Sequence, residues 1–301
     1  MDDTRNSILS LLALAHAESL PALSFADVCA LLPASHAKNN TRKEIASLLA
    51  LFEKERVVVS RDGWYALAQA PDVDEIKNRV EIARQKIARN RFFFLLMQMI
   101  PFVEAALITG SVSMGNAKTE SDIDILCIAK KGRIWTARIL LLFLAELFGK
   151  RRERGHGVDK LCFNCFIAPT AVFPLRNLAS AHMLARALPL FGTEALDLFF
   201  TENAWMKEYV SRHSLAPLIP LSRTLHAISR ATAWLLSGSI GDALERALTR
   251  WQIRRLHKKV KNGTDASGLV LRDDAVTLYY PDSKNKAVMT RYTDIIAKID
   301  L

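Results

Sequence analysis

The sequence predicts an α+β protein in three parts, with boundaries at residues 1–70, 71–170 and 171–301. Three observations support this prediction. Apolar residues recur at helical spacing near the N-terminus and are followed by two short β-rich runs. In the middle of the chain, apolar runs typical of strands alternate with helical patterns. From about residue 171 onward the pattern is mainly helical.

In the N-terminal part, the sequence predicts three helices followed by a β-hairpin. Ser24 or Asp27 is expected to cap the second helix, and Thr41 with Glu44 forms a capping-box pattern at the third. The segment 61–63, Arg-Asp-Gly, is a hairpin signal. This order resembles a winged helix-turn-helix, and two uses stay open: contact with nucleic acid, or packing and dimerisation. Acidic residues match the basic ones on the third helix, so it has no strong basic face.

A charged linker helix and a core of strands and helices are expected next. The segment 71–91 predicts a long helix that becomes apolar at Phe92 and ends or kinks at Pro101. The expected core elements then follow in this order: strand 105–109, a short helix, strand 123–129, helix 134–148 and strand 161–167. A short strand in LVLRD and a last helix are expected to finish the chain.

Composition limits the classes of function. The chain has 301 residues, half of them hydrophobic, and a formal net charge of +10. It can form two or three domains, and its basic balance permits binding to nucleic acid or nucleotides without selecting either. Four cysteines do not make a disulfide framework. Cys162 and Cys165 lack the second Cys/His pair of a structural zinc site, so both are interpreted as thiols in a buried strand.

We expect no membrane partner and a cytoplasmic location. The N-terminus begins with acidic residues and lacks the basic region of a signal peptide. The apolar stretch 92–108 is interrupted by polar residues. The apolar stretch 134–148 is too short to cross ~30 Å of hydrocarbon.

The stretch 107–129, LITGSVSMGNAKTESDIDILCIA, combines a phosphate-binding turn with a pair of carboxylates. Asp122 and Asp124 are two positions apart in a strand, so both side chains point to one face. Such carboxylates repel unless a cation neutralises them, and Mg²⁺ prefers oxygen ligands. Gly110 lets the backbone approach a phosphate, and Ser111 adds a hydroxyl at a helix start. The combination predicts a site for a phosphate and a metal ion.

The run TGSVSMGNAKTESDIDIL resembles the signature of the nucleotidyltransferase (DNA polymerase β) superfamily: an apolar strand, Gly-Ser, and Asp-hydrophobic-Asp. The following GRIWTARILLLFLAELFGKRR is similar to bacterial stand-alone members. The resemblance implies a polymerase-β-like core, a small mixed sheet with helices on one side. It also implies a reaction in which a hydroxyl attacks the α-phosphorus of an NTP and releases pyrophosphate, with Mg²⁺ or Mn²⁺ as cofactor.

The resemblance also implies roles for individual residues. Asp122 and Asp124 would coordinate the metal ions, and Gly110 and Ser111 would bind the triphosphate. The other residues expected to contact the substrate are Ser113, Lys118, Ser121 and Asn164. The acceptor stays open between an RNA or DNA end, a protein side chain and a small hydroxylated molecule.

Active members of this superfamily usually carry a third acidic residue on a later strand. Alternation in LCFNCFIA places Asn164 there, with Cys162 and Phe166 on the same face. An amide has no charge and cannot act as a base. Asp159 is the nearest carboxylate, but it lies five residues before Asn164. In a regular strand their side chains would therefore point to opposite faces. Three options stay open: Asp159 is the third catalytic carboxylate, two carboxylates suffice, or the protein is a catalytically silent nucleotide- or nucleic-acid-binding regulatory protein.

Basic residues flank the expected site and recur near the C-terminus. They could neutralise phosphates or form solvated surfaces. The residues near the site are Lys118, Lys130, Lys131, Arg133, Arg151, Arg152, Arg154 and His156. The helix ERALTRWQIRRLHKKVKNG could bind a nucleic-acid backbone, or be a mostly solvated helix with Trp251 buried.

Overall fold

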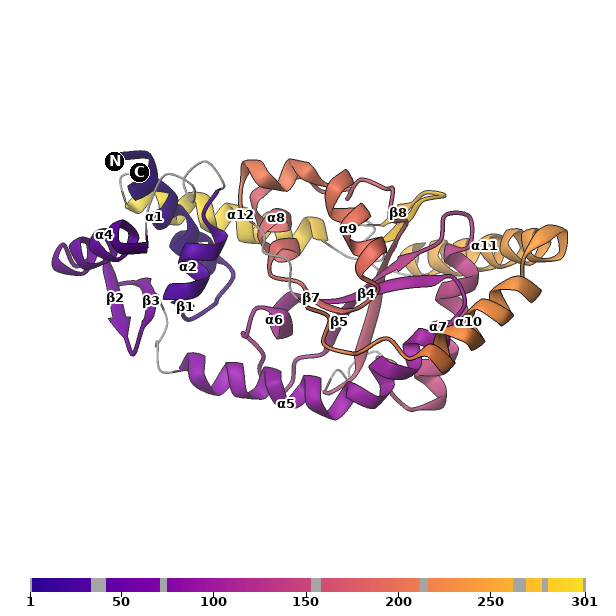
Figure 1. Ribbon diagram of the computed structural model, residues 1–301. Helices are drawn as coiled ribbons and strands as arrows, with labels where there is room; N and C mark the ends of the chain where they lie inside the picture. The colour runs from indigo at the N-terminus through magenta and orange to yellow at the C-terminus, as the bar shows by residue number, and fades with distance from the viewer. Residues whose placement is uncertain are drawn as a thin grey trace.

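The structure is a computed structural model that describes residues 2–33, 42–70, 75–152, 158–211, 216–261, 269–277 and 281–299. It is a mixed α+β protein, as predicted, with a small N-terminal sheet and a larger central sheet (Figure 1). Three residues singled out in the sequence, Thr41, Arg154 and His156, lie outside the described part of the chain.

The N-terminal part contains the predicted helices and hairpin. Its elements are α1 (Asp2–Ala17), β1 (Leu23–Ser24), α2 (Phe25–Leu31), α4 (Arg42–Lys54), β2 (Val58–Arg61) and β3 (Trp64–Leu67). The Ser24 hydroxyl accepts from the Asp27 N–H at 3.1 Å, and the Asp27 carboxylate accepts from the Ser24 N–H at 3.3 Å. The two residues therefore form one capping box. Asp62 and Gly63 have φ of 52° and 79°, as a tight hairpin turn requires.

Among the described residues, the central sheet has six strands in the order β7-β4-β5-β6-β9-β8. Their bounds are β4 (Val103–Thr109), β5 (Ile123–Ala129), β6 (Leu161–Ile167), β7 (Leu188–Phe191), β8 (Val270–Leu271) and β9 (Ala275–Thr277). β5 and β6 are parallel and are connected through α7 (Ile134–Leu147), whereas the other neighbouring pairs are antiparallel. The predicted strands and helix of the core are thus confirmed, with small changes at their ends.

Three strands of this sheet come from the part of the chain predicted to be mainly helical. β8 corresponds to the predicted LVLRD strand, whereas β7 and β9 were not predicted. β7 has four residues and contains Pro189, which cannot donate to a central ladder. The structure places β7 at the edge of the sheet, where a proline is tolerated.

Helices cover both faces of the central sheet, not one face as the resemblance implied. On one face, α5 (Glu75–Leu96), α7, α10 (Arg223–Leu235) and α11 (Gly238–Lys261) share a core with Ile123 and Ile125. On the other face, α8 (Leu178–Ala185) and α9 (Thr193–Glu202) pack with Leu126 and Ile128. The alternating residues of β5 are therefore buried on both sides, which holds the strand rigidly.

The long helix α5 runs along the sheet from the N-terminal part toward α7 and α10 (Figure 1). It ends at Leu96 and a 3₁₀ turn follows before Pro101, as predicted. The last helix, α12 (Pro281–Lys298), returns to α1, where the Tyr292 and Ser10 hydroxyls are 2.6 Å apart. None of the helices in the described ranges combines the length and apolar composition needed to cross a membrane.

Candidate functional site

The predicted phosphate turn and the predicted carboxylates meet at one edge of the central sheet. Thr109, the last residue of β4, lies opposite Asp124 of β5. Gly110 follows and begins the short helix α6 (Gly110–Ser113). Its φ is 69°, and a Cβ at this position would lie 2.6 Å from Oδ2 of Asp124. Only glycine permits this conformation together with so close an approach of backbone to carboxylate.

Asp122, Asp124 and Cys162 come together at this place, which we name the carboxylate edge. One ligand atom from each lies within 4.8 Å of the others, and all three residues are half-buried. Asp124 and Cys162 are direct neighbours in the parallel β5–β6 register. The prediction that the two aspartates share a face is confirmed, and the spacing suits the binding of one metal ion.

The third side chain at the carboxylate edge is Cys162, which the sequence did not assign to the site. The two residues that flank Asn164 pair with consecutive residues of β5, so Asn164 is the extra residue of a β-bulge. Because the bulge reverses the alternation, Phe166 packs in the core with Phe163, on the α5 and α7 side of the sheet. The predicted shared face of Cys162 and Phe166 is therefore wrong. The side chain of Asn164 lies outside the described part.

Arg152 brings a positive charge to the carboxylate edge. Its Nη1 lies 2.6 Å from Oδ2 of Asp122 and 3.6 Å from Sγ of Cys162. Burial and the charges of Asp124 and Asp122 raise the pKa of Cys162 to about 12, although Arg152 opposes this shift. In this arrangement the thiol is protonated near neutral pH. The side chain of Arg152 is 51% exposed, so this cation is held at the surface.

The loop that follows the phosphate turn is held by residues from other elements. Arg79 of α5 donates to Oδ1 of Asn116 at 2.6 Å and to the Ser19 carbonyl at 3.0 Å. Arg186, which follows α8, donates to the Met114 carbonyl at 2.9 Å. The loop is therefore fixed from several sides, which is the support that a preorganised binding turn needs.

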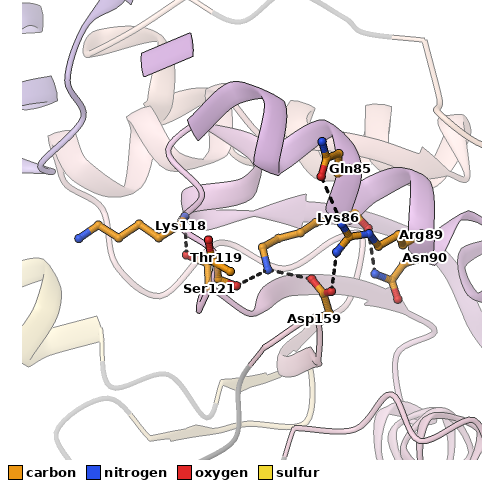
Figure 2. A network of polar contacts seen from close by, with 8 residues as sticks. All are labelled: Gln85, Lys86, Arg89, Asn90, Lys118, Thr119, Ser121 and Asp159. Atoms are coloured by element: carbon orange, nitrogen blue, oxygen red, sulfur yellow. Dashed lines mark hydrogen bonds and ion pairs between the residues drawn. The ribbon is translucent and has the colours of Figure 1, made fainter. Parts of the chain in front are cut away.

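The predicted serines and lysine of these loops have different positions. The Ser113 hydroxyl donates to the Gly110 carbonyl at 3.0 Å, and the Ser121 hydroxyl accepts from the Lys118 N–H at 3.0 Å. Both hydroxyls thus stabilise turns around the site. Ser111 is half-buried in α6, next to Gly110. Lys118 is exposed, and its side chain extends away from the neighbouring polar network formed by Lys86, Arg89 and Asp159 (Figure 2).

Asp159 belongs to that polar network on α5 and is not one of the three residues that come together at the carboxylate edge (Figure 2). Its carboxylate accepts from Nζ of Lys86 at 2.8 Å and from Nη1 of Arg89 at 2.9 Å. Burial raises the pKa of Asp159, but the hydrogen bonds and charges of Lys86 and Arg89 outweigh it, so the net shift is downward. A lowered pKa makes this carboxylate a weaker base.

The cations after β5 lie at the opposite end of the strand. Lys130 and Lys131 follow Ala129, which is roughly 17 Å along the strand from Asp124 at ~3.3 Å per residue. Together with Arg133 they line a separate cleft of about 1260 Å³ beside α9 and α10. They therefore do not flank the carboxylate edge, contrary to the prediction.

The basic helix α11 packs on α7 through its polar residues. The Glu245 carboxylate accepts from the Trp135 and Thr136 N–H groups, each at 2.9 Å, and so satisfies free donors at the start of α7. Trp251 is 47% exposed, with Arg255 over its ring at 5.6 Å. The interpretation of Trp251 as a buried residue is wrong.

The two carboxylates of the carboxylate edge fit a hard divalent cation with part of its coordination left for other ligands. Mg²⁺ is typically bound by one or two carboxylates and keeps water and phosphate ligands. The ion pair between Arg152 and Asp122 indicates that this edge attracts positive charge. No family model, curated protein or solved structure matches the chain.

Proposed function

We propose that the protein is a metal-dependent nucleotidyltransferase that moves a nucleoside monophosphate from an NTP to a hydroxyl acceptor. The close approach of Gly110 to Asp124 carries the proposal, since a Cβ would lie 2.6 Å from the carboxylate oxygen. A triphosphate on this turn and a cation on the carboxylates would occupy adjoining space. Metal-bound triphosphates need that arrangement, in which the ion contacts protein carboxylates and phosphate oxygens together.

The residues of the site support distinct steps of substrate binding. Asp122 and Asp124 would hold Mg²⁺ or Mn²⁺, and the bound ion would neutralise charge that develops on the phosphate oxygens. The backbone at Gly110 and Ser111 would bind the triphosphate. Arg152 would offer its planar guanidinium to phosphate oxygens. Phosphoryl transfer is catalysed mainly by positioning and electrostatics, which these residues can supply without covalent chemistry.

A second candidate function is NTP binding without transfer, and Cys162 favours it. The carboxylate edge has a thiol where a third carboxylate would complete the set. A neutral thiol is a weak hydrogen-bond acceptor and a poor ligand for a hard cation. It would neither accept the proton of an attacking hydroxyl nor help to hold a second ion. The protein would then bind an NTP for a regulatory purpose.

Finer features of the architecture belong to the same proposal. The β5–α7–β6 unit beside the Gly110 turn supports a polymerase-β-like core. The order of helices and hairpin in residues 2–67 supports a winged-helix-like module, and such a module would favour an RNA or DNA acceptor. The proposed location is the cytoplasm, where NTPs are available.

A transfer assay distinguishes the two candidates. The protein is incubated with Mg²⁺ or Mn²⁺, each α-labelled NTP, and separate pools of RNA, protein and metabolites, beside the Asp122→Asn variant. Label that enters one pool, and fails to enter it with the variant, supports the transferase and identifies the acceptor class. NTP binding without label in any pool supports the silent binder. The absence of both transfer and binding contradicts both candidates.

A further inference from the structure

We propose that Lys86 and Asp159 are positioning residues that hold the two loops leading into the carboxylate edge. The inference rests on the proposed function and gives Asp159 a role other than that of a third catalytic carboxylate. It concerns contacts that neither the motif nor the alternation of residues indicates.

One buried ammonium group connects both loops to α5. Lys86 is 2% exposed and projects between the loops (Figure 2). Its Nζ donates to the Thr119 carbonyl at 2.9 Å and to Oδ1 of Asp159 at 2.8 Å. Thr119 precedes Asp122 by three residues, and Asp159 precedes Cys162 by three residues. Lys86 therefore fixes the chain three residues before Asp122 and three residues before Cys162.

Further contacts complete this network. Arg89 donates to the second oxygen of Asp159 at 2.9 Å and to Oε1 of Gln85 at 3.2 Å. The two loops also contact each other, because the Ile123 N–H donates to the Lys160 carbonyl at 2.9 Å. Asp159 has a φ of 54°, a left-handed conformation that is uncommon outside glycine. The contacts with α5 hold the residue in it.

Simple packing does not require a lysine at this position. A buried ammonium is unfavourable unless it is paired and hydrogen-bonded. Elsewhere α5 packs against the sheet through apolar residues such as Phe93 and Phe94. A hydrogen-bonded lysine, in contrast, fixes both the direction and the spacing of its partners. That property matters where two neighbouring strands must place their side chains at a set separation around one metal site.

The test compares Mn²⁺ affinity, measured by electron paramagnetic resonance on the full chain, with local hydrogen exchange. Lys86→Met keeps a long buried side chain without the ammonium, and Asp159→Asn keeps the shape of the side chain without its charge. Lys77→Met is the matched control, since Lys77 lies on the same helix but pairs with Asp62 at the surface. Asp122→Asn is the control for the metal site itself. Exchange is followed in segments 118–123 and 158–162, with α7 as the reference.

The sign of the Lys86→Met effect is decisive. Removal of a nearby cation should by electrostatics alone strengthen Mn²⁺ binding. A positioning role predicts the opposite, a loss of about 10- to 100-fold in affinity, as for other residues that orient metal ligands. A lysine ammonium cannot itself ligate Mn²⁺. A loss of Mn²⁺ affinity in Lys86→Met would therefore show that direct ligation by Asp159 is not the whole explanation. We expect faster exchange in both loop segments, unchanged exchange in α7, and no effect of Lys77→Met.

Other outcomes overturn the inference. Wild-type or tighter Mn²⁺ binding in Lys86→Met, while Asp122→Asn abolishes binding, would contradict the positioning role and leave the proposed function intact. Faster exchange throughout the chain in both Lys86→Met and Asp159→Asn would indicate general destabilisation and contradict it as well. If the wild-type chain binds no Mn²⁺, with or without NTP, the proposed function and the inference are both contradicted.

Discussion

Two carboxylate–cation networks lie near the starts of β5 and β6, and they differ in burial. At the carboxylate edge, Asp122 pairs with Arg152, whose side chain is 51% exposed. In the neighbouring network, Asp159 pairs with Lys86, whose side chain is 3% exposed. Exposed ion pairs contribute little and can exchange partners, whereas breaking a buried pair leaves an uncompensated charge. We therefore expect Lys86 to stay paired with Asp159, whereas another cation can replace Arg152 at Asp122.

The largest effect is expected at the carboxylate edge itself. Asp124→Asn removes one of the two carboxylates and should lower transfer by more than ~100-fold, the scale observed when one preorganised electrostatic group is lost. The fold should persist, because the substitution also removes repulsion between two like charges. Labelled transfer and a thermal melt measure both effects. Full transfer by Asp124→Asn would show that the chemistry lies elsewhere.

The second-largest effect is expected for a substitution at the predicted phosphate turn. Gly110→Ala introduces a Cβ that would lie 2.6 Å from an Asp124 oxygen, at a φ of 69°. Gly132→Ala is the matched control, because Gly132 has a φ of 74° but no atom within 4 Å of the added Cβ. Both should destabilise the fold by about 1–3 kcal/mol through backbone strain.

Only Gly110→Ala should also abolish Mn²⁺ and NTP binding, because only there does the methyl group displace a ligand. Chemical denaturation and Mn²⁺ titration of the two variants give the comparison. Equal binding by both variants would contradict the close approach of turn and carboxylate as a functional feature.

Introducing a third carboxylate should increase the difference between the two networks. Cys162→Asp adds a negative oxygen ligand beside Asp124, and hard cations bind more tightly as the charge count of their ligands rises. We expect Mn²⁺ affinity to increase about 10-fold and stability without metal to decrease through like-charge repulsion. If Mn²⁺ does not restore the melting temperature of this variant, Cys162 does not face the metal site.

Removal of the exposed cation should have a small effect of opposite sign to that expected for Lys86→Met. Arg152→Gln frees Asp122 from an exposed ion pair worth about 0–1 kcal/mol. Mn²⁺ binding without NTP should therefore tighten by up to about 5-fold, while NTP binding weakens. Titrations with and without NTP separate the two effects. Weaker Mn²⁺ binding without NTP would mean that Arg152 also has a positioning role.

The smallest effect concerns stability in acid. Burial raises the pKa of Asp159, but Lys86 and Arg89 lower it by more. A lowered pKa contributes stability that is present above the unfolded-state pKa of about 3.9 and is lost as the pH falls through the folded-state value. The stability advantage of the wild type over Asp159→Asn should thus shrink as the pH falls below about 4. Urea denaturation across this range measures it, and a constant difference would contradict the pairing.

Local patterns in the sequence predict the centre of the fold well. β5 and β6 lie at their predicted residues because their apolar runs are long and clearly bounded. The proximity of Gly110 and Asp124 could be predicted because it follows from residue type and short-range spacing. The bulge at Asn164 could not be predicted, since one extra residue reverses the alternation without a local signal.

Long-range pairing accounts for the remaining differences. Lys86 and Asp159 are 73 residues apart, and nothing in either local sequence indicates their contact. Asp159 therefore looked available as a catalytic carboxylate, whereas the structure pairs it with two cations of α5. Likewise, β7 and β9 are short strands that depend on the edges of an existing sheet.

The most direct test of the proposed site is Mn²⁺ binding to the full chain in the presence of a non-hydrolysable NTP, compared with the Asp122→Asn variant. We predict that the wild type binds Mn²⁺ and the nucleotide together, each strengthening the other, and that Asp122→Asn loses Mn²⁺ binding while remaining folded. Equal Mn²⁺ binding by both proteins, or none by either, would contradict a metal and triphosphate site at the carboxylate edge.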